Sequence, residues 1–134
     1  MTDDTAGSLL RSYPRSRQPL TKEHKEIFVA EYKLNRCGGT WLYRLTQYLE
    51  SWMHRAVAAR GRGIQGSILE IGAGALNHIP YEQSCCIYNC VEPFKELYED
   101  SAYSHRVRRL YDDMSDIPDE AQYDRILSVA VLEH

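Results

Sequence analysis

Two acidic residues and a pair of glycines stand where a nucleotide-like cofactor could be held. Glu70 lies in the apolar segment 68–71, directly before Gly72 and Gly74. Glycine allows a sharp turn after a strand and lets backbone N–H groups approach a ligand closely. Glu92 follows 20 residues after Gly72, at the end of a second apolar segment. An acid at that position can accept both hydroxyls of a ribose, so the pattern predicts a cofactor across the carboxyl ends of these segments.

Two classes of cofactor use such a turn. A dinucleotide requires G-x-G-x-x-G and a following helix whose N-terminus meets the pyrophosphate. Here Asn77 stands at the third glycine position, and Pro80 shortens any helix that follows. S-adenosylmethionine (SAM) has no phosphate, needs no third glycine, and is compatible with Glu70 two residues before the first glycine. The spacing therefore favours SAM. An NAD-binding Rossmann protein is kept as a less favoured hypothesis, after the two that are given at the end of this section.

The segments that must position these residues alternate between strand and helix patterns. Apolar runs predict four strands, and Pro93 in the first turn predicts a short helix over 94–100. Strands separated by helices or loops indicate a parallel α/β sheet. In the last run, Ile126, Leu127, Val129 and Val131 suit a strand buried on both faces. The four predicted strands cover residues 68–71, 87–91, 107–111 and 123–131.

The N-terminal part has a different pattern. Residues 1–20 are predicted to be a flexible tail, and residues 21–66 a helical cap before the sheet begins at 67. Thr21 suits an N-cap, and a second helix is predicted over 41–60. Its tryptophans, Trp41 and Trp52, are expected in the core. The tyrosines Tyr13, Tyr32 and Tyr43 could line a lid over the cofactor, but packing or surface positions are favoured for them.

Composition and charge narrow the function classes. The chain has 134 residues, 43% of them hydrophobic, with no run of about 18 apolar residues and no apolar signal region, which favours a cytoplasmic protein without a membrane span. Residues 1–66 carry 11 Lys and Arg against 6 Asp and Glu, whereas residues 67–134 carry 5 against 13. A basic cap beside an acidic sheet is favoured over a nucleic-acid-binding arm. Cysteines without C-x-x-C spacing and singly scattered histidines (His24, His54, His78, His105) predict no metal site.

Four segments taken together resemble a known family. LEIGAG, VEPF, DDMSDIP and YDRILSVAVLEH are similar, in order and spacing, to the successive cofactor-binding segments of class I SAM-dependent methyltransferases. The resemblance covers about 67–134 and implies a Rossmann-like sheet whose full strand order is 3-2-1-4-5-7-6. Only the first four strands, 3-2-1-4, are expected here, so the domain is expected to be truncated, without the C-terminal half of the fold. LEIGAG-x-LNH also resembles methyltransferases among bacterial saccharide-modifying enzymes.

The resemblance implies roles for the residues around the first two strands. Glu70 would lie near the methionine part of the cofactor, and Gly72, Ala73 and Gly74 would form the turn beneath it. Glu92 would hold the ribose hydroxyls, with Phe94 beside the adenine. This half of the sheet, residues 67–134, would therefore be the SAM-binding part of the chain.

Further roles fall on residues after the third and fourth strands. Asp113 would accept from the adenine amino group, with Asp112 as an adjacent competitor, and the Met114 N–H would meet a ring nitrogen. Ser128 would end the fourth strand under the cofactor. His134 is the candidate general base, although Leu-Glu-His is also how common purification tags begin.

The leading functional hypothesis is therefore methyl transfer from SAM by in-line displacement, with S-adenosylhomocysteine as the product. The expected acceptor is a small molecule or saccharide, and the basic cap could complement an anionic one. The alternative is a non-catalytic SAM- or nucleotide-binding module. An unpaired sheet edge would favour a homodimer.

Overall fold

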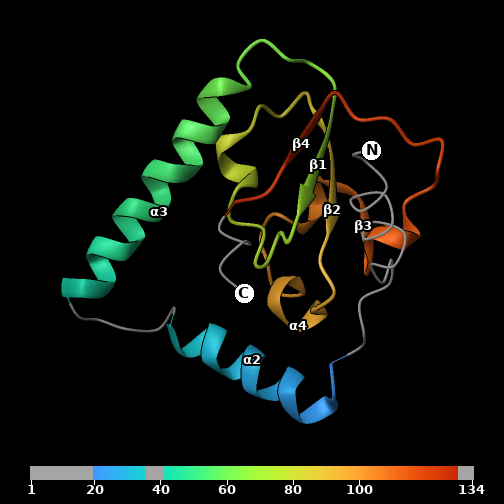
Figure 1. Cartoon of the computed structure of the whole chain (residues 1–134). Coiled ribbons are helices and arrows are strands. Elements are labelled where there is room, and N and C mark those ends of the chain that lie inside the picture. Colours follow the sequence, from blue (N-terminus) through green and yellow to red (C-terminus); the bar gives the residue numbers. More distant parts are fainter. Residues whose placement is uncertain (1–19, 36–40, 130–134) are drawn as a thin grey trace, which may run out of the picture.

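The centre of the molecule is a parallel sheet. A computed structural model describes residues 20–35 and 41–129, and its four strands lie in the order β3-β2-β1-β4 (Figure 1). All three strand pairings are parallel, which confirms the predicted α/β fold and the strand order 3-2-1-4. The strands are β1 (Ser67–Ile71), β2 (Ile87–Val91), β3 (Val107–Tyr111) and β4 (Arg125–Leu127).

The register of the sheet determines which residues follow neighbouring strands at the same level. β1 and β2 pair from Ser67↔Ile87 to Ile71↔Val91 without a shift. The residues that follow, Gly72 and Glu92, therefore leave neighbouring strands at the same level. On the other side of β1, Glu70 pairs with Leu127 of β4. The carboxyl ends of β1, β2 and β4 thus meet at one edge of the sheet.

The last strand differs from its prediction. A strand over 123–131 is expected from the sequence, but β4 covers only Arg125–Leu127, and residues 130–134 lie outside the described part. Leu127 is buried, whereas Ile126 is 61% exposed, so the prediction of burial on both faces was wrong. Successive side chains of a strand point to opposite faces, and Leu127 takes the face of the core cluster. Ile126 therefore points to the opposite face.

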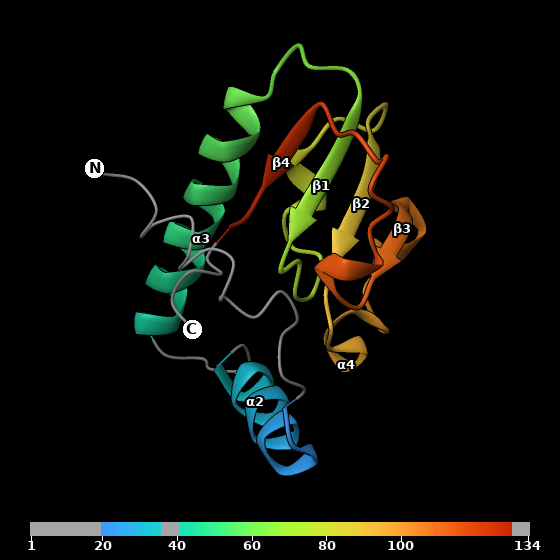
Figure 2. The same cartoon turned by 45° about the vertical axis from the view of Figure 1, so that its right-hand side comes forward.

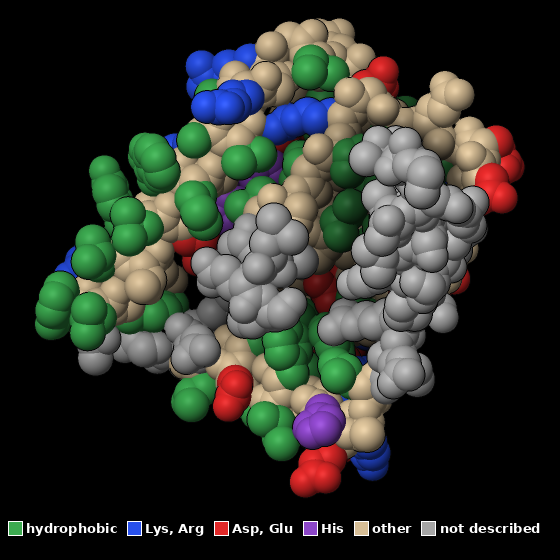
Figure 3. All heavy atoms as spheres, in the orientation of Figure 1, with side chains coloured by type: hydrophobic (Ala, Val, Ile, Leu, Met, Phe, Trp, Pro, Cys, Tyr) green, Lys and Arg blue, Asp and Glu red, His purple; other side chains and the backbone are tan. Residues whose placement is uncertain are grey.

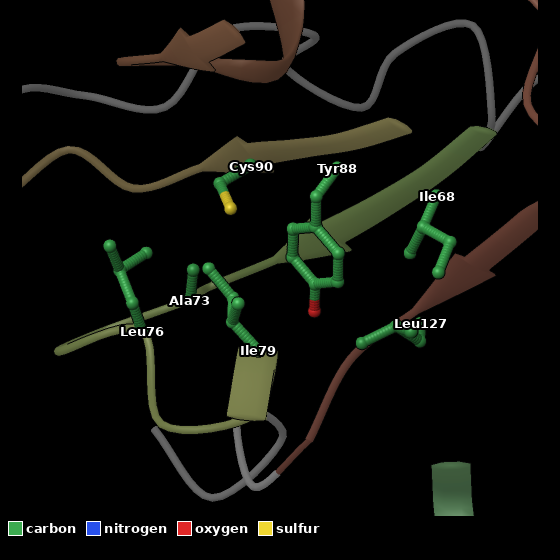
Figure 4. Close-up of a cluster of buried hydrophobic side chains, with 7 residues drawn as sticks. All are labelled: Ile68, Ala73, Leu76, Ile79, Tyr88, Cys90 and Leu127. Carbon is green, nitrogen blue, oxygen red and sulfur yellow. The ribbon is translucent and has the colours of Figure 1, made fainter. Parts of the chain in front are cut away.

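The hydrophobic core cluster lies on one face of the sheet, and Leu69 and Val91 are buried on the opposite face. The buried side chains of the cluster come from β1, β2, β4 and the loop after β1, and Tyr88 extends from β2 into their middle (Figure 4). In that loop the helical part is η1 (Ile79–Tyr81), a single 3-10 turn with a proline at its start. The cluster consists of Ile68, Ala73, Leu76, Ile79, Tyr88, Cys90 and Leu127.

In the part of the chain that the structure describes, three α-helices accompany the sheet, namely α2 (Lys22–Asn35), α3 (Trp41–Arg60) and α4 (Lys95–Tyr98). The predicted N-cap is confirmed, because the N–H of His24 donates to Thr21 Oγ1 at 3.3 Å. α3 has the predicted bounds, whereas α4 is shorter than 94–100. Both views place α2 across the end of the sheet toward which β1 and β2 point, next to α4 (Figures 1 and 2).

The orientation of α3 is the main departure from expectation. Trp41 and Trp52 are 72% and 61% exposed, so their prediction as core residues was wrong. Most of the large apolar side chains of this helix lie on its outer surface (Figure 3), whereas Met53 and Val57 are half-buried and His54 is buried against the loop after β1. Hydrophobic periodicity identifies residues that share a helix face, but it does not say which way that face points. The exposed set is Trp41, Leu42, Leu45, Tyr48, Leu49 and Trp52.

Within the described ranges, 20–35 and 41–129, the helices are too short or too polar for any of them to cross a membrane.

Candidate cofactor site

The glycine turn after β1 has the geometry that its sequence predicts. Gly72 and Gly74 have φ values of 70° and 53°, in the left-handed region that favours glycine. The Gly72 N–H donates to the carbonyl of Val91 at 2.8 Å, and the Ala73 N–H approaches the same oxygen at 3.4 Å. These bonds hold the turn against the end of β2. The chain consequently reverses direction directly beside Glu92.

The Glu92 carboxylate connects the ends of the two central strands. It is 4% exposed, and its Oε2 accepts from the Gly74 N–H at 2.7 Å while Oε1 accepts from the Phe94 N–H at 3.0 Å. A carboxylate has about four lone-pair directions. Here the two oxygens each accept from a backbone N–H, one in the turn after β1 and one in the segment after β2. The predicted ribose acceptor is thus also the group that fixes the turn.

Glu70 is enclosed in the protein. It is 2% exposed, and its Oε2 accepts from the Tyr88 hydroxyl at 2.9 Å. Burial is the main cause that raises the pKa of this carboxyl to about 8, and the nearby Glu82 and Glu92 add to the effect. At pH 7 Glu70 is therefore mostly protonated. Its polar group is directed at Tyr88 within the core.

Helix α2 covers the turn with aromatic side chains. The Tyr32 hydroxyl accepts from the Ala75 N–H at 3.2 Å, and the rings of Phe28 and Phe94 lie 4.8 Å apart. Lys25 lies 5.9 Å from the centre of the Phe94 ring. The sequence favours a packing or surface position for Tyr32 and indicates no role for Phe28. Their i, i+4 spacing indicates a common face, but only the tertiary structure shows that this face meets the turn.

This contact predicts how the turn responds to substitution. A Cβ at Gly74 would lie 2.7 Å from the Tyr32 hydroxyl, whereas one at Gly63, which also has a positive φ, would have no atom within 4 Å. Gly63→Ala is expected to cost about 1 kcal/mol through backbone strain alone. Gly74→Ala should cost more, and most of the excess should disappear in the Tyr32→Ala background. Urea unfolding of the four variants measures this coupling, and equal costs for the two glycines would contradict it.

The loop after β3 is ordered by its own acidic residues. Asp113 caps η3 (Met114–Asp116), where its Oδ1 accepts from the N–H and the hydroxyl of Ser115 at 2.8 Å each. Asp116 accepts in return from the Asp113 N–H at 2.9 Å. Met114 is 49% exposed. The predicted adenine-binding residues therefore lie in a capped turn that directly follows β3, the outer neighbour of β2.

The remaining predicted positions lie after β4. Ser128 is exposed. It directly follows Leu127, the residue of β4 that pairs with Glu70, and Ser128 therefore lies at the level of Ile71 at the end of β1. His134, the candidate base, lies outside the described residues. Of the predicted site residues, the structure brings Gly72, Gly74, Glu92 and Phe94 into one hydrogen-bonded unit, with Ala73 between the glycines. Asp113, Met114 and Ser128 follow strands that end at the same edge of the sheet.

Within the described ranges there is no group of three or more His, Cys, Asp or Glu residues arranged to hold a metal ion. Comparison of the chain with family models, with curated proteins and with solved structures found no match.

Proposed function

We propose that this chain binds SAM and forms the cofactor-binding part of a Rossmann-like class I methyltransferase. The observation that carries the proposal is the Glu92 carboxylate, which joins the glycine turn after β1 to the start of the segment after β2. In parallel α/β sheets, ligands bind outside the carboxyl ends of the strands, where the strand order reverses. In the order β3-β2-β1-β4 that reversal falls between β1 and β4, next to the turn.

The loop after the turn favours SAM over a dinucleotide. A pyrophosphate needs the N–H groups and the dipole at the start of a helix. Residues 72–86 contain only the three-residue η1, whose start carries Pro80. A single turn with a missing N–H is a poor partner for two phosphates. SAM has no phosphate, so the same loop suits it.

Each part of the site has a role in this proposal. Glu92 accepts the ribose hydroxyls while it holds the turn, and Phe94 with the capped Asp113 turn flanks the adenine. Bound SAM would supply the methyl group: an acceptor atom would bond to the methyl carbon as the carbon–sulfur bond breaks with its electron pair on sulfur, which would yield S-adenosylhomocysteine, and a proton carried by the acceptor would pass to solvent. Because the sulfonium is already a good leaving group, proximity and orientation supply most of the acceleration. We propose a small-molecule or saccharide acceptor.

Ligand-induced stabilisation tests the proposal. SAM and S-adenosylhomocysteine, each at about 100 times its dissociation constant, are expected to stabilise the chain by about 2.7 kcal/mol, with no comparable effect of NAD. Thermal unfolding followed by fluorescence measures the shift, and calorimetric titration measures the affinity. Stabilisation by NAD alone, or by none of the three compounds, would refute SAM binding. Transfer of labelled methyl from SAM to candidate acceptors then tests catalysis separately.

A further inference from the structure

The outer surface of α3 carries a continuous row of large apolar side chains. They recur at one- and three-residue steps between Trp41 and Trp52, which places them along one side of the helix for about 17 Å. Each of the six is between 46% and 72% exposed. Two of them are the only tryptophans of the sequence. The members of this outer face of α3 are Trp41, Leu42, Leu45, Tyr48, Leu49 and Trp52 (Figure 3).

This outer face is accessible because α3 lies at the periphery of the molecule. Both views place the helix outside the sheet (Figures 1 and 2). On the inner side, the one buried residue of the helix, His54, approaches His78 of the loop after β1, with 3.0 Å between their Nδ1 atoms. Single apolar residues are common on protein surfaces, but contiguous patches of them mark sites that contact proteins or membranes. The outer face of α3 is therefore a candidate interaction surface.

The exposed charges that border this face are positive. Arg44 and Arg55 are exposed, and each stands three residues from a tryptophan of the outer face; Arg60 is exposed at the end of the helix. The one acidic residue of α3, Glu50, lies on the same side of the helix as the buried His54, with 3.8 Å between their side chains. Two copies of α3 that packed on each other would bring arginines against arginines, and like charges in an interface are unfavourable. The charge of the helix therefore favours an anionic partner over a second copy.

We propose that the outer face of α3 is a binding surface for an anionic phospholipid membrane. An interfacial helix presents tryptophan and leucine to the boundary of the acyl chains and basic residues to the headgroups. Tryptophan and tyrosine favour this boundary because each combines an apolar ring with a polar group. The arginines attract negatively charged headgroups and keep the helix along the membrane surface, not across it. The outer face of α3 shares no residue with the proposed SAM site, so membrane binding does not require SAM.

Tryptophan fluorescence tests the proposal without a label, because both tryptophans of the chain belong to the outer face of α3. The probes are vesicles of phosphatidylglycerol and phosphatidylcholine in equal parts, compared with vesicles of phosphatidylcholine alone. The anionic vesicles are expected to shift the emission to shorter wavelength and to protect both tryptophans from quenching by acrylamide, with or without SAM. The neutral vesicles should bind at least about tenfold more weakly, because they lack the attraction to the arginines. No shift with anionic vesicles, or equal binding of neutral vesicles, would overturn the proposal.

Two substitutions at exposed positions separate the apolar from the electrostatic contribution. Leu45→Gln removes apolar surface from the middle of the face and should weaken binding to anionic vesicles roughly tenfold. Arg44→Gln should weaken it about fivefold and reduce its dependence on salt. The matched controls are Leu34→Gln on α2 and Arg108→Gln on β3, which are exposed outside this face and should bind like the wild type. Wild-type affinity of Leu45→Gln would overturn the proposal.

Light scattering without vesicles tests the competing occupant, a second copy of the chain. The mass in solution is expected to be the same for the wild type and for Leu45→Gln. A wild-type dimer that Leu45→Gln dissociates would assign the outer face of α3 to contact between copies and would overturn the proposal.

Discussion

Glu92→Gln is expected to lower the free energy of unfolding by about 2–3 kcal/mol and to weaken SAM binding at least tenfold. The wild-type carboxylate accepts from the Gly74 and Phe94 N–H groups at 2.7 and 3.0 Å in a position that is 4% exposed. A glutamine has one oxygen and one NH₂ group. One of the two backbone N–H groups would therefore face another donor, buried from water and without its acceptor.

The two effects of Glu92→Gln separate structure from function. Urea unfolding followed by circular dichroism measures stability, and calorimetric titration with SAM measures binding. Glu99→Gln, an exposed carboxylate beyond α4, is the matched control and should change neither quantity. Loss of stability with unchanged SAM affinity would show that Glu92 only holds the turn. Unchanged stability would contradict the hydrogen-bond geometry itself.

Glu70→Gln is expected to stabilise the chain at pH 8 by several kcal/mol. The pKa of Glu70 is raised from 4.5 to about 8, chiefly by burial. Between these values the folded chain keeps a proton that the unfolded chain has released, so the wild type loses stability as the pH rises from about 4.5 to 8. The loss is about 1.4 kcal/mol per unit of pKa difference. Glutamine cannot ionise, and its oxygen can still accept from the Tyr88 hydroxyl.

Urea unfolding at several pH values between 5 and 9 tests whether the stability of the wild type falls with rising pH as expected. The advantage of Glu70→Gln over the wild type should grow up to pH 8 and level off above it, and at pH 5 the two chains should be closer in stability. Glu120→Gln, at an exposed position, should follow the wild type at every pH. A constant difference between Glu70→Gln and the wild type would show that Glu70 does not titrate in this range.

Local patterns predict most of the secondary structure. The bounds of β2, β3 and α3 agree with the sequence, and β1 begins one residue earlier, at Ser67. These elements are predictable because runs of apolar residues and caps act over short distances. The glycine turn and Glu92 are predictable for the same reason, since each ends or follows such a run. The register of β1 and β2 then brings them together.

Tertiary contacts account for what the sequence does not predict. Where β4 begins and ends depends on the strands that pair with it. In the described ranges β4 pairs with β1 alone, so its short length could not be predicted from its own residues. The contact of Tyr32 with Ala75 spans 43 residues, and the pairing of His54 with His78 spans 24. Periodicity predicts that Trp41 and Trp52 belong to the apolar side of α3, but no local signal shows that this side faces outward. Histidines scattered along the chain likewise give no sign of a buried pair.

The attachment of α3 has a consequence for the cooperativity of the fold. This helix is tied to the rest of the molecule by His54, its one buried residue, and by the Arg125 bond to Val57, whereas β1 and β2 carry buried side chains on both faces of the sheet. Detaching α3 would therefore expose little new apolar surface, and such an opening depends only weakly on denaturant. Segments of this kind open as separate units below the global unfolding free energy. The amide hydrogens of α3 should accordingly exchange with solvent long before those of the central strands, which makes the helix a partly independent unit of the folded chain.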